Sequence, residues 1–265
     1  MTMERAELIL LADLNYIEAM RDQTRGCEGT IIEEEGVCMM LGPAPHPVLN
    51  VLVRLDDRCS GDECVEQAMG LFDASRHGFT VILRNSVDDS DVREAAIAAG
   101  LVPLLSPTEM VVHERVDAPD LGDDVVIRVV ADPAGVADFA NIAADAWTTY
   151  GMSPEVTRQT FANGTLARAP HVRAVVAYRD GRPVSCALAH ASHGIAGLYW
   201  VSTVRDSRGR GLGEACTRAV TNLAFDLGAR FVSLQASPMG EPIYGRIGFE
   251  AIATYELLAA LEPGA

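Results

Sequence analysis

Residues 198–214 read LYWVSTVRDSRGRGLGE, a short apolar run followed by a glycine-rich turn and then by apolar positions at helical spacing. This order predicts a strand that leads through the turn directly into a helix. Gly209, Gly211 and Gly213 leave the main-chain amides unshielded, and a helix start concentrates unpaired N–H groups and the positive end of the helix dipole. The turn is therefore a candidate diphosphate site, although a plain strand-to-helix turn has the same pattern.

The overall charge narrows the choice of ligand. The 265 residues include 37 Asp and Glu against 21 basic residues, a net charge of -16 at pH 7, and most of the excess lies in the first half of the chain. This balance disfavours nucleic acid and an anionic membrane as partners and fits a cationic small molecule. All the basic residues are Arg, because the chain contains no Lys, so a Walker-type phosphate lysine and Schiff-base chemistry are excluded.

The spacing of the glycines excludes a second class of nucleotide site. A dinucleotide-binding fold needs G-x-G-x-x-G and an acidic residue about twenty positions later. Here the spacing is G-x-G-x-G, and the strand that follows ends in Gln235-Ala236. Arg208 and Arg210 add positive charge to the turn, so the turn is still a candidate site for a phosphate ligand other than a dinucleotide.

The second half predicts an α/β (α+β) domain. Proline follows a capping residue at Asp132-Pro133 and at Ser153-Pro154, which marks two helix starts. Asp180-Gly181 predicts a tight turn between antiparallel strands. In chain order we expect helices at 133–147 and 154–166, strands at 174–178, 184–190 and 195–201, a helix at 212–227, a strand at 231–235, a short helix at 242–246 and a strand at 251–258. These elements make a mixed, mostly antiparallel sheet flanked by helices.

The first half repeats this order of elements. It predicts a helix at 4–20 and strands at 30–34, 37–41 and 48–55, followed by helix, strand, helix and strand. Gly78 and Gly228 each precede a strand, and Gly100 and Gly248 each follow a helix, at nearly equal separations along the chain. The agreement of order and separation predicts a tandem duplication.

One segment separates the two copies. Residues 117–124, DAPDLGDD, are polar and turn-rich between two apolar, strand-like runs. They are the predicted linker between a first domain of residues 1–116 and a second domain of residues 125–265.

The cysteines, histidines and N-terminus exclude further classes. The six cysteines are scattered, and the close pair Cys59 and Cys64 lacks zinc-knuckle spacing, so we expect buried or idle thiols. His190 and His193 match no metal signature, so we expect no metal. The apolar run near the N-terminus is too short, and its acidic flank is wrong, for a signal peptide or a spanning helix. We therefore expect a cytoplasmic protein without a membrane partner.

The segment Arg208-Gly-Arg-Gly211-Leu-Gly213 resembles the cofactor motif of the GNAT superfamily of acyl-CoA-dependent N-acyltransferases, which is Arg or Gln, two residues, Gly, one residue, then Gly or Ala. Downstream, Ile243-Tyr244 and Gly248-Phe249 are similar to the family's closing tyrosine and Gly-Phe pair. The resemblance extends over residues 125–265. With the duplication, it implies two tandem GNAT-like domains, of which the second carries the motifs.

The resemblance also implies which residues bind acetyl-CoA. The main chain of Val201, Ser202 and Thr203 would pair with the pantetheine arm. The diphosphate would be held at the turn by Arg208, Gly209, Arg210, Gly211, Leu212 and Gly213. The sequence departs from the family at Thr203-Val204-Arg205, where Val-x-Pro is frequent, and at Ser237, where Asn is common. Neither change removes an amide donor, but we expect Ser237 to make a weaker contact with the pantetheine.

Tyr244 is the predicted catalytic residue. Acyl transfer from a thioester leaves a thiolate, and a phenol with a pKa near 10 can protonate it as it departs. A strand amide between Val201 and Thr203 would stabilise the oxyanion. A tyrosine that only packs in the core is the alternative.

Other parts of the acceptor site are less marked in the sequence. The attacking amine must be neutral, yet a structural or solvated role fits each candidate base better than catalysis: Glu214, Glu241 and His190. The family places its acceptor near the loop between the first two helices. Residues of that loop either line the acceptor pocket or pack in the core: Trp147, Thr149 and Tyr150.

The first copy lacks the cofactor motif. Arg58 and Gly61 align with the arginine and glycine of the turn, but Asp62 and Glu63 stand at the helix start, where a diphosphate would lie. Ala96 replaces the tyrosine. Carboxylates at a helix start would repel the cofactor, although they are also ordinary partners of the helix dipole. We therefore expect one active site per chain.

These inferences together predict an N-acetyltransferase. It would move acetyl from acetyl-CoA to a primary amine of a small molecule or peptide by direct transfer, without a cysteine nucleophile. A non-catalytic acyl-CoA-binding sensor or scaffold is the alternative from another class, and a different thioester reaction such as decarboxylation is a third possibility. Both a monomer and a homodimer are compatible with the sequence.

Overall fold

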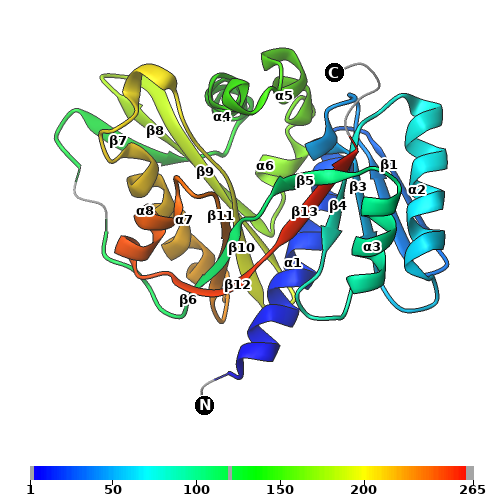
Figure 1. The fold of residues 1–265 in the computed structure, drawn as a ribbon. Helices are drawn as coiled ribbons and strands as arrows, with labels where there is room; N and C mark the ends of the chain where they lie inside the picture. Colours follow the sequence, from blue (N-terminus) through cyan, green and yellow to red (C-terminus); the bar gives the residue numbers. More distant parts are fainter. Residues whose placement is uncertain (1–2, 119–120, 261–265) are drawn as a thin grey trace.

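The chain forms two β-sheets side by side, with the first helix, α1 (Arg5–Gly26), running between them (Figure 1). The computed structural model describes residues 3–118 and 121–260. Both sheets are mixed, mostly antiparallel and flanked by helices, which confirms the predicted fold class. Helix α1 is longer than predicted at its C-terminal end, because its last turns pack against elements of the second half.

The larger sheet consists mostly of strands from the second half. In spatial order its strands are β12 (Glu250–Thr254), β6 (Thr108–Val112), β11 (Val232–Ala236), β10 (Ile195–Thr203), β9 (Arg182–Ser192), β8 (Val172–Arg179) and β7 (Val125–Val129). The β10–β11 pair is parallel and the other neighbours are antiparallel. The turn predicted at Asp180-Gly181 joins β8 to β9, and both residues have positive φ.

The smaller sheet repeats this plan in the first half. In spatial order its strands are β1 (Thr30–Glu34), β2 (Val37–Leu41), β3 (Val51–Arg54), β4 (Phe79–Leu83), β13 (Glu256–Ala260) and β5 (Val102–Leu105). The β3–β4 pair is parallel, as β10 and β11 are in the other sheet. The strand predicted at 48–55 begins instead as the 3-10 helix η1 (Pro47–Leu49), because Pro47 follows a capping His46.

The two sheets exchange their last strands. β6 is inserted between β11 and β12, and β13 is inserted between β4 and β5. The two crossing segments touch, since the Tyr255 N–H donates to the Pro107 carbonyl at 2.9 Å. The single strand predicted at 251–258 is therefore wrong: the chain breaks at Tyr255 and continues in the other sheet. Residues 1–116 thus supply one strand to the larger sheet, and residues 125–265 supply one to the smaller sheet.

The remaining helices cover the sheets. They are α2 (Gly61–Ser75), α3 (Ser90–Ala98), α4 (Pro133–Trp147), η2 (Thr148–Tyr150), α5 (Pro154–Thr160), α6 (Thr165–Arg168), η3 (Arg205–Ser207), α7 (Leu212–Asp226) and α8 (Glu241–Ile247). The helix predicted at 154–166 is two short helices, because Gly164 adopts a φ of +67° between them. On β9, Ser185 faces α7 and Cys186 faces α4, so these helices cover opposite faces of the larger sheet. No helix in the described part of the chain is long and apolar enough to span a membrane.

Candidate active site

Strands β10 and β11 separate part-way along their length. They pair only from Ala196 to Leu198 of β10. Beyond Leu198 a β-bulge shifts the register of β10 against β9, and Trp200 has a φ of +56°. Residues 199–203 consequently have no strand partner on the β11 side within the described chain. Val201, Ser202 and Thr203, the predicted pantetheine contacts, all lie on this free edge.

The glycine-rich turn lies at the C-terminal end of β10, as predicted. Gly209 and Gly211 have φ of +73° and +74°, and an added Cβ at either position would meet nothing within 4 Å. Gly211 is the N-cap of α7, and no side chain of the described residues caps this helix start. The first amides of α7 and the helix dipole therefore face open space, which suits an anion.

Arg208 does not extend into this space. Its Nε donates to the Thr203 carbonyl at 3.2 Å, and its Nη2 donates to the Thr149 hydroxyl at 3.3 Å and weakly to the Ala146 carbonyl at 3.5 Å. The side chain therefore ties the turn to the end of β10 and to the C-terminal end of α4. Arg208 therefore supports the turn structurally, and its positive charge lies next to the start of α7.

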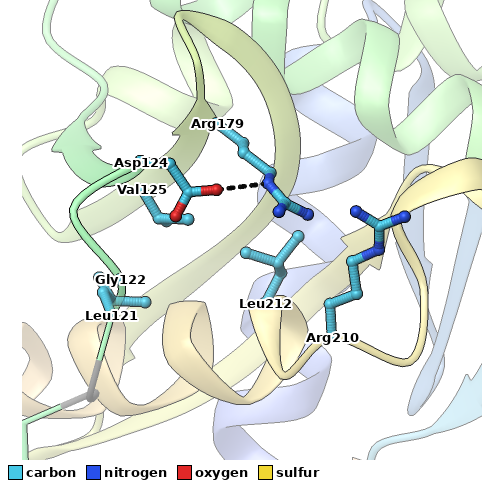
Figure 2. Close-up of a pocket in the computed structure, with 7 residues that line it drawn as sticks. All are labelled: Leu121, Gly122, Asp124, Val125, Arg179, Arg210 and Leu212. Atoms are coloured by element: carbon cyan, nitrogen blue, oxygen red, sulfur yellow. Dashed lines mark hydrogen bonds and ion pairs between the residues drawn. The ribbon is translucent and has the colours of Figure 1, made fainter.

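Arg210 is an exposed charge of the turn. It lies with Leu212 and Arg179 around a hollow of about 260 Å³ beside the start of α7 (Figure 2). Arg179 is neutralised by Asp124, whose Oδ2 lies 2.6 Å from its Nε. Arg210 makes no ion pair with any of the described residues, so its guanidinium is available to an anionic ligand.

Ser237 and Tyr244 lie together at the start of α8. The Ser237 carbonyl and hydroxyl both accept from the Gly240 N–H, at 2.8 and 3.3 Å, and so shape the turn before the helix. The Tyr244 ring lies across Gly240, where an added Cβ would come within 2.8 Å of it. Burial, and secondly the nearby Tyr150, raises the pKa of Tyr244 to about 12. The phenol therefore keeps its proton at neutral pH.

The predicted acceptor loop lies beside the bulge. Trp147 packs against Trp200 with ring centroids 4.5 Å apart and against Tyr150 with centroids 5.3 Å apart. Phe161 adds an edge-on contact to Trp200 at 5.0 Å. Tyr150 is 43% exposed and influences the pKa of Tyr244. The structure thus brings the loop, the bulge and Tyr244 to one end of the larger sheet.

Three candidate bases already have partners. Glu241 accepts from the Thr108 hydroxyl at 2.8 Å. Glu214 pairs with Arg218 and Arg246 on the surface of the molecule. His190 is buried and lies 3.0 Å from Asp22. These contacts agree with the structural roles that the sequence suggests for them.

One buried carboxyl was missed at the level of the sequence. Glu109 lies on β6, is only 1% exposed, and receives one hydrogen bond, from Gln235 Nε2 at 2.7 Å. Burial raises its pKa to about 8; the hydrogen bond from Gln235 opposes the shift and the charge of Asp13 adds to it. The signal was present, since a lone acidic residue interrupts the strand-like segment 108–112.

The cysteines and a histidine cluster carry no chemistry that we can assign. All six cysteines are free and buried, as expected, and burial raises the pKa of Cys186 and Cys216. Asp22, His171 and His190 could together face a metal ion. However, a metal-bound His190 would need an acceptor for its other ring nitrogen, and Nδ1 has no partner in the described chain. We assign this cluster to the packing of α1 against the larger sheet.

The corresponding helix start in the first half is closed. Ser60 caps α2, with its hydroxyl accepting from the Glu63 N–H while the Glu63 carboxylate accepts from Ser60 N–H at 3.0 Å. The Gly61 N–H donates to the Asp91 carboxylate at 2.8 Å. An added Cβ on Gly61 would lie 2.4 Å from the Asp91 main chain, so there is no room for a ligand. Side-chain oxygens of the protein occupy the place of a phosphate.

Comparisons with known proteins identify the domain. Residues 113–240 match the model of the acetyltransferase (GNAT) domain. No curated protein matches this chain.

Solved structures extend the likeness to almost the whole chain. A GCN5-related N-acetyltransferase from Kribbella flavida is 20% identical, with a TM-score of 0.66 over 94% of this chain and 95% of that one. One from Sphaerobacter thermophilus is 15% identical, with a TM-score of 0.64 over 87% and 78%. A tandem GNAT protein from the clavulanic acid biosynthesis pathway is 15% identical, with a TM-score of 0.58 over 86% and 79%. Residues 113–240 therefore match a GNAT acetyltransferase domain, and the chain as a whole has the fold of these solved GNAT structures, a tandem GNAT protein among them.

Proposed function

We propose that this chain is an acyl-CoA-dependent N-acyltransferase that moves acetyl from acetyl-CoA to a primary amine of a small molecule or peptide. The observation that carries the proposal is the uncapped start of α7, next to the place where β10 and β11 separate. Few ligands need both an anion site and an extended groove, and a diphosphate with a long amide-containing arm is one of them.

The residues present fit this ligand. The amides from Gly209 to Gly213 would bind the diphosphate, and Arg210 would add a charge-assisted contact. The free edge of β10 from Val201 to Thr203 would pair with the amides of the pantetheine arm. Ser237 would make a weaker contact than the family's Asn, because its side chain is shorter and its hydroxyl already accepts from the Gly240 N–H. When bound, acetyl-CoA supplies the activated acyl group and a thiolate leaving group.

Tyr244 would hold the proton that the leaving thiolate requires. The phenol holds its proton at neutral pH, and a thiolate formed next to it would take that proton at Oη as the C–S bond breaks. An amide of the free β10 edge would donate to the developing oxyanion.

Direct transfer to the amine is favoured over an acyl-cysteine step. A nucleophilic cysteine must be accessible and partly ionised. Cys186 and Cys216 are buried, and burial raises the pKa of Cys216 to about 12. Retention of Tyr244 beside the gap likewise favours an enzyme over a sensor, which needs no proton donor.

The test is thiol release from acetyl-CoA with a panel of primary amines. Turnover of any amine, together with an acetylated product of the expected mass, supports the transferase. Binding of acetyl-CoA without turnover of any amine would favour the sensor. A burst of acylated cysteine in the intact-mass spectrum would overturn direct transfer.

A further inference from the structure

Glu109 occupies an unusual place in the fold. It lies on β6, the strand that the first half gives to the larger sheet, directly opposite Gln235 of β11. Gln235 Nε2 donates to Oε2, whereas Oε1 has no hydrogen-bond partner in the described chain. A buried carboxyl oxygen without a partner costs stability, and such groups are found preferentially where a site uses them.

The register places this carboxyl one strand away from the separation of β10 and β11. Leu198 of β10 and Leu234 of β11 form the last pair, so Tyr199 and Gln235 are the first residues beyond it. Glu109 is the next residue across the sheet from Gln235. These three side chains therefore form a row across β10, β11 and β6, at the end of the gap.

The row faces α1. Tyr199 Oη donates to Asn15 Oδ1 at 2.8 Å, and the Tyr16 ring stacks on the Tyr199 ring with centroids 6.2 Å apart. Helix α1 packs on the face of the sheet that α4 also covers, and the predicted acceptor loop follows α4. The row therefore lies on the acceptor side of the gap, opposite the face covered by α7.

No cation neutralises Glu109 within the described chain. The polar groups that face it are Ser233 and Gln235 of β11, Asp13 and Tyr16 of α1, Tyr199 of β10, and Tyr255 between β12 and β13. Asp13 differs from Glu109, because both of its oxygens accept hydrogen bonds, one from Tyr255 Oη and one from the Ser86 N–H, and Arg84 lies near it. Of these two carboxyl groups, Glu109 is thus the one with an oxygen that can accept a further hydrogen bond.

We propose that Glu109 Oε1 takes the proton that a primary ammonium must lose before its nitrogen attacks the thioester, directly or through one water. This rests on the proposed function. Through Glu109, the first half of the chain would contribute a catalytic group to a site whose other residues lie in the second half. The substrate class follows from it: an amine that arrives as a cation, because a neutral amine needs no such base.

Each proton that moves in this reaction has a donor and an acceptor. The ammonium gives one proton to the Glu109 carboxylate, and the neutral nitrogen forms the C–N bond with the thioester carbon. The C–S bond breaks, and the thiolate takes the Tyr244 proton. The second proton on the nitrogen returns to Tyr244, which leaves an amide, a thiol and a protonated Glu109. Glu109 then releases its proton to solvent, and its raised pKa suits a base that works near pH 8.

The test compares two amines of similar size in wild type and in Glu109→Gln. Ethylamine is cationic at pH 8, whereas 2,2,2-trifluoroethylamine is already neutral. We expect E109Q to lower kcat/KM for ethylamine by about 100-fold and to leave the value for trifluoroethylamine within about threefold. In wild type, kcat/KM for trifluoroethylamine should not require the ionised carboxylate, whereas kcat/KM for ethylamine should rise as the pH rises through the pKa of Glu109.

Asp13→Asn is the matched control. It removes a charge that adds to the effect of burial on the pKa of Glu109, so the rise in kcat/KM for ethylamine should move to lower pH while the ratio between the amines is kept. Thermal stabilisation by acetyl-CoA would show that E109Q is folded. If E109Q does not fold, the pH profile of D13N still tests the proposal. Equal losses for both amines in E109Q, or an unshifted profile in D13N, would overturn the role of Glu109 while the transferase stands. A wild type that binds acetyl-CoA but acetylates neither these amines nor the wider panel would overturn the proposed function and this inference with it.

Discussion

The amino ends of α2 and α7 hold corresponding places in the two halves, but one is closed and the other is open. At α2, the Ser60–Glu63 capping box and the Asp91 carboxylate take the free amides. The Ser60 N–H, and next its hydroxyl, hold the pKa of Glu63 below its ordinary value, so the carboxylate is charged. At α7, Gly211 has a positive φ, and no described side chain caps the helix.

The capping of these two helices decides where this repeated fold has an anion site. The order of strand, turn and helix is the same in both halves, and α2 and α7 both have 15 residues, so their dipoles are about equal. The first half satisfies its helix with its own carboxylates, which stabilises the domain. The second half leaves the amides unsatisfied, at a cost to stability that a bound phosphate would offset.

The largest effect is expected when the start of α7 is closed as the start of α2 is closed. Gly211→Asp would place a carboxylate on the free amides, and we expect acetyl-CoA binding to weaken by about 100-fold or more. Gly211→Asn is the control, because Asn also tolerates positive φ but carries no charge. Calorimetric titration should find a much smaller loss for the Asn variant; equal losses would show that shape and not charge matters.

Removing the proton donor should leave binding intact. Tyr244→Phe keeps the ring across Gly240 but lacks the hydroxyl. We expect kcat to fall by about 100-fold and the affinity for acetyl-CoA to stay the same. A variant with wild-type kcat would end the role of Tyr244 as the acid.

The free arginine of the open turn should contribute a moderate, salt-dependent part of the affinity. Arg210→Ala is expected to raise the Kd of acetyl-CoA by about tenfold at low salt, with the difference shrinking as salt is added. Arg179→Ala is the matched control, because Asp124 already neutralises Arg179. A larger rise in Kd from Arg179→Ala than from Arg210→Ala would contradict the proposal that Arg210 contacts the diphosphate.

Opening the first half should not create a second site. Ser60→Ala removes the cap of α2 and should cost about 1 kcal/mol of stability. The Asp91 carboxylate still blocks the Gly61 amide, so acetyl-CoA stoichiometry should stay at the wild-type value. Thermal unfolding of this variant measures the loss of stability, and calorimetry measures the stoichiometry. A second acetyl-CoA site in Ser60→Ala would contradict the proposal that Asp91 also closes the start of α2.

The sequence predicted the local elements well, because they depend on neighbouring residues. The caps at Asp132 and Ser153, the turn at Asp180-Gly181 and the glycine-rich turn all appear where the pattern placed them. The strand exchange was missed, because residues 251–258 have the pattern of one continuous strand and the assignment of β12 and β13 to different sheets depends on partners far away in sequence. Glu109 was missed for the same reason, since its importance appears only when β6 joins the larger sheet.

The most direct measurement is a calorimetric titration of the purified chain with acetyl-CoA, with thermal unfolding in parallel. We expect one binding site per chain, a clear rise in Tm, and loss of both in Gly211→Asp. Two sites per chain would contradict the closed start of α2. If acetyl-CoA did not bind at all, the start of α7 would not be its binding site, and the proposed function would be contradicted.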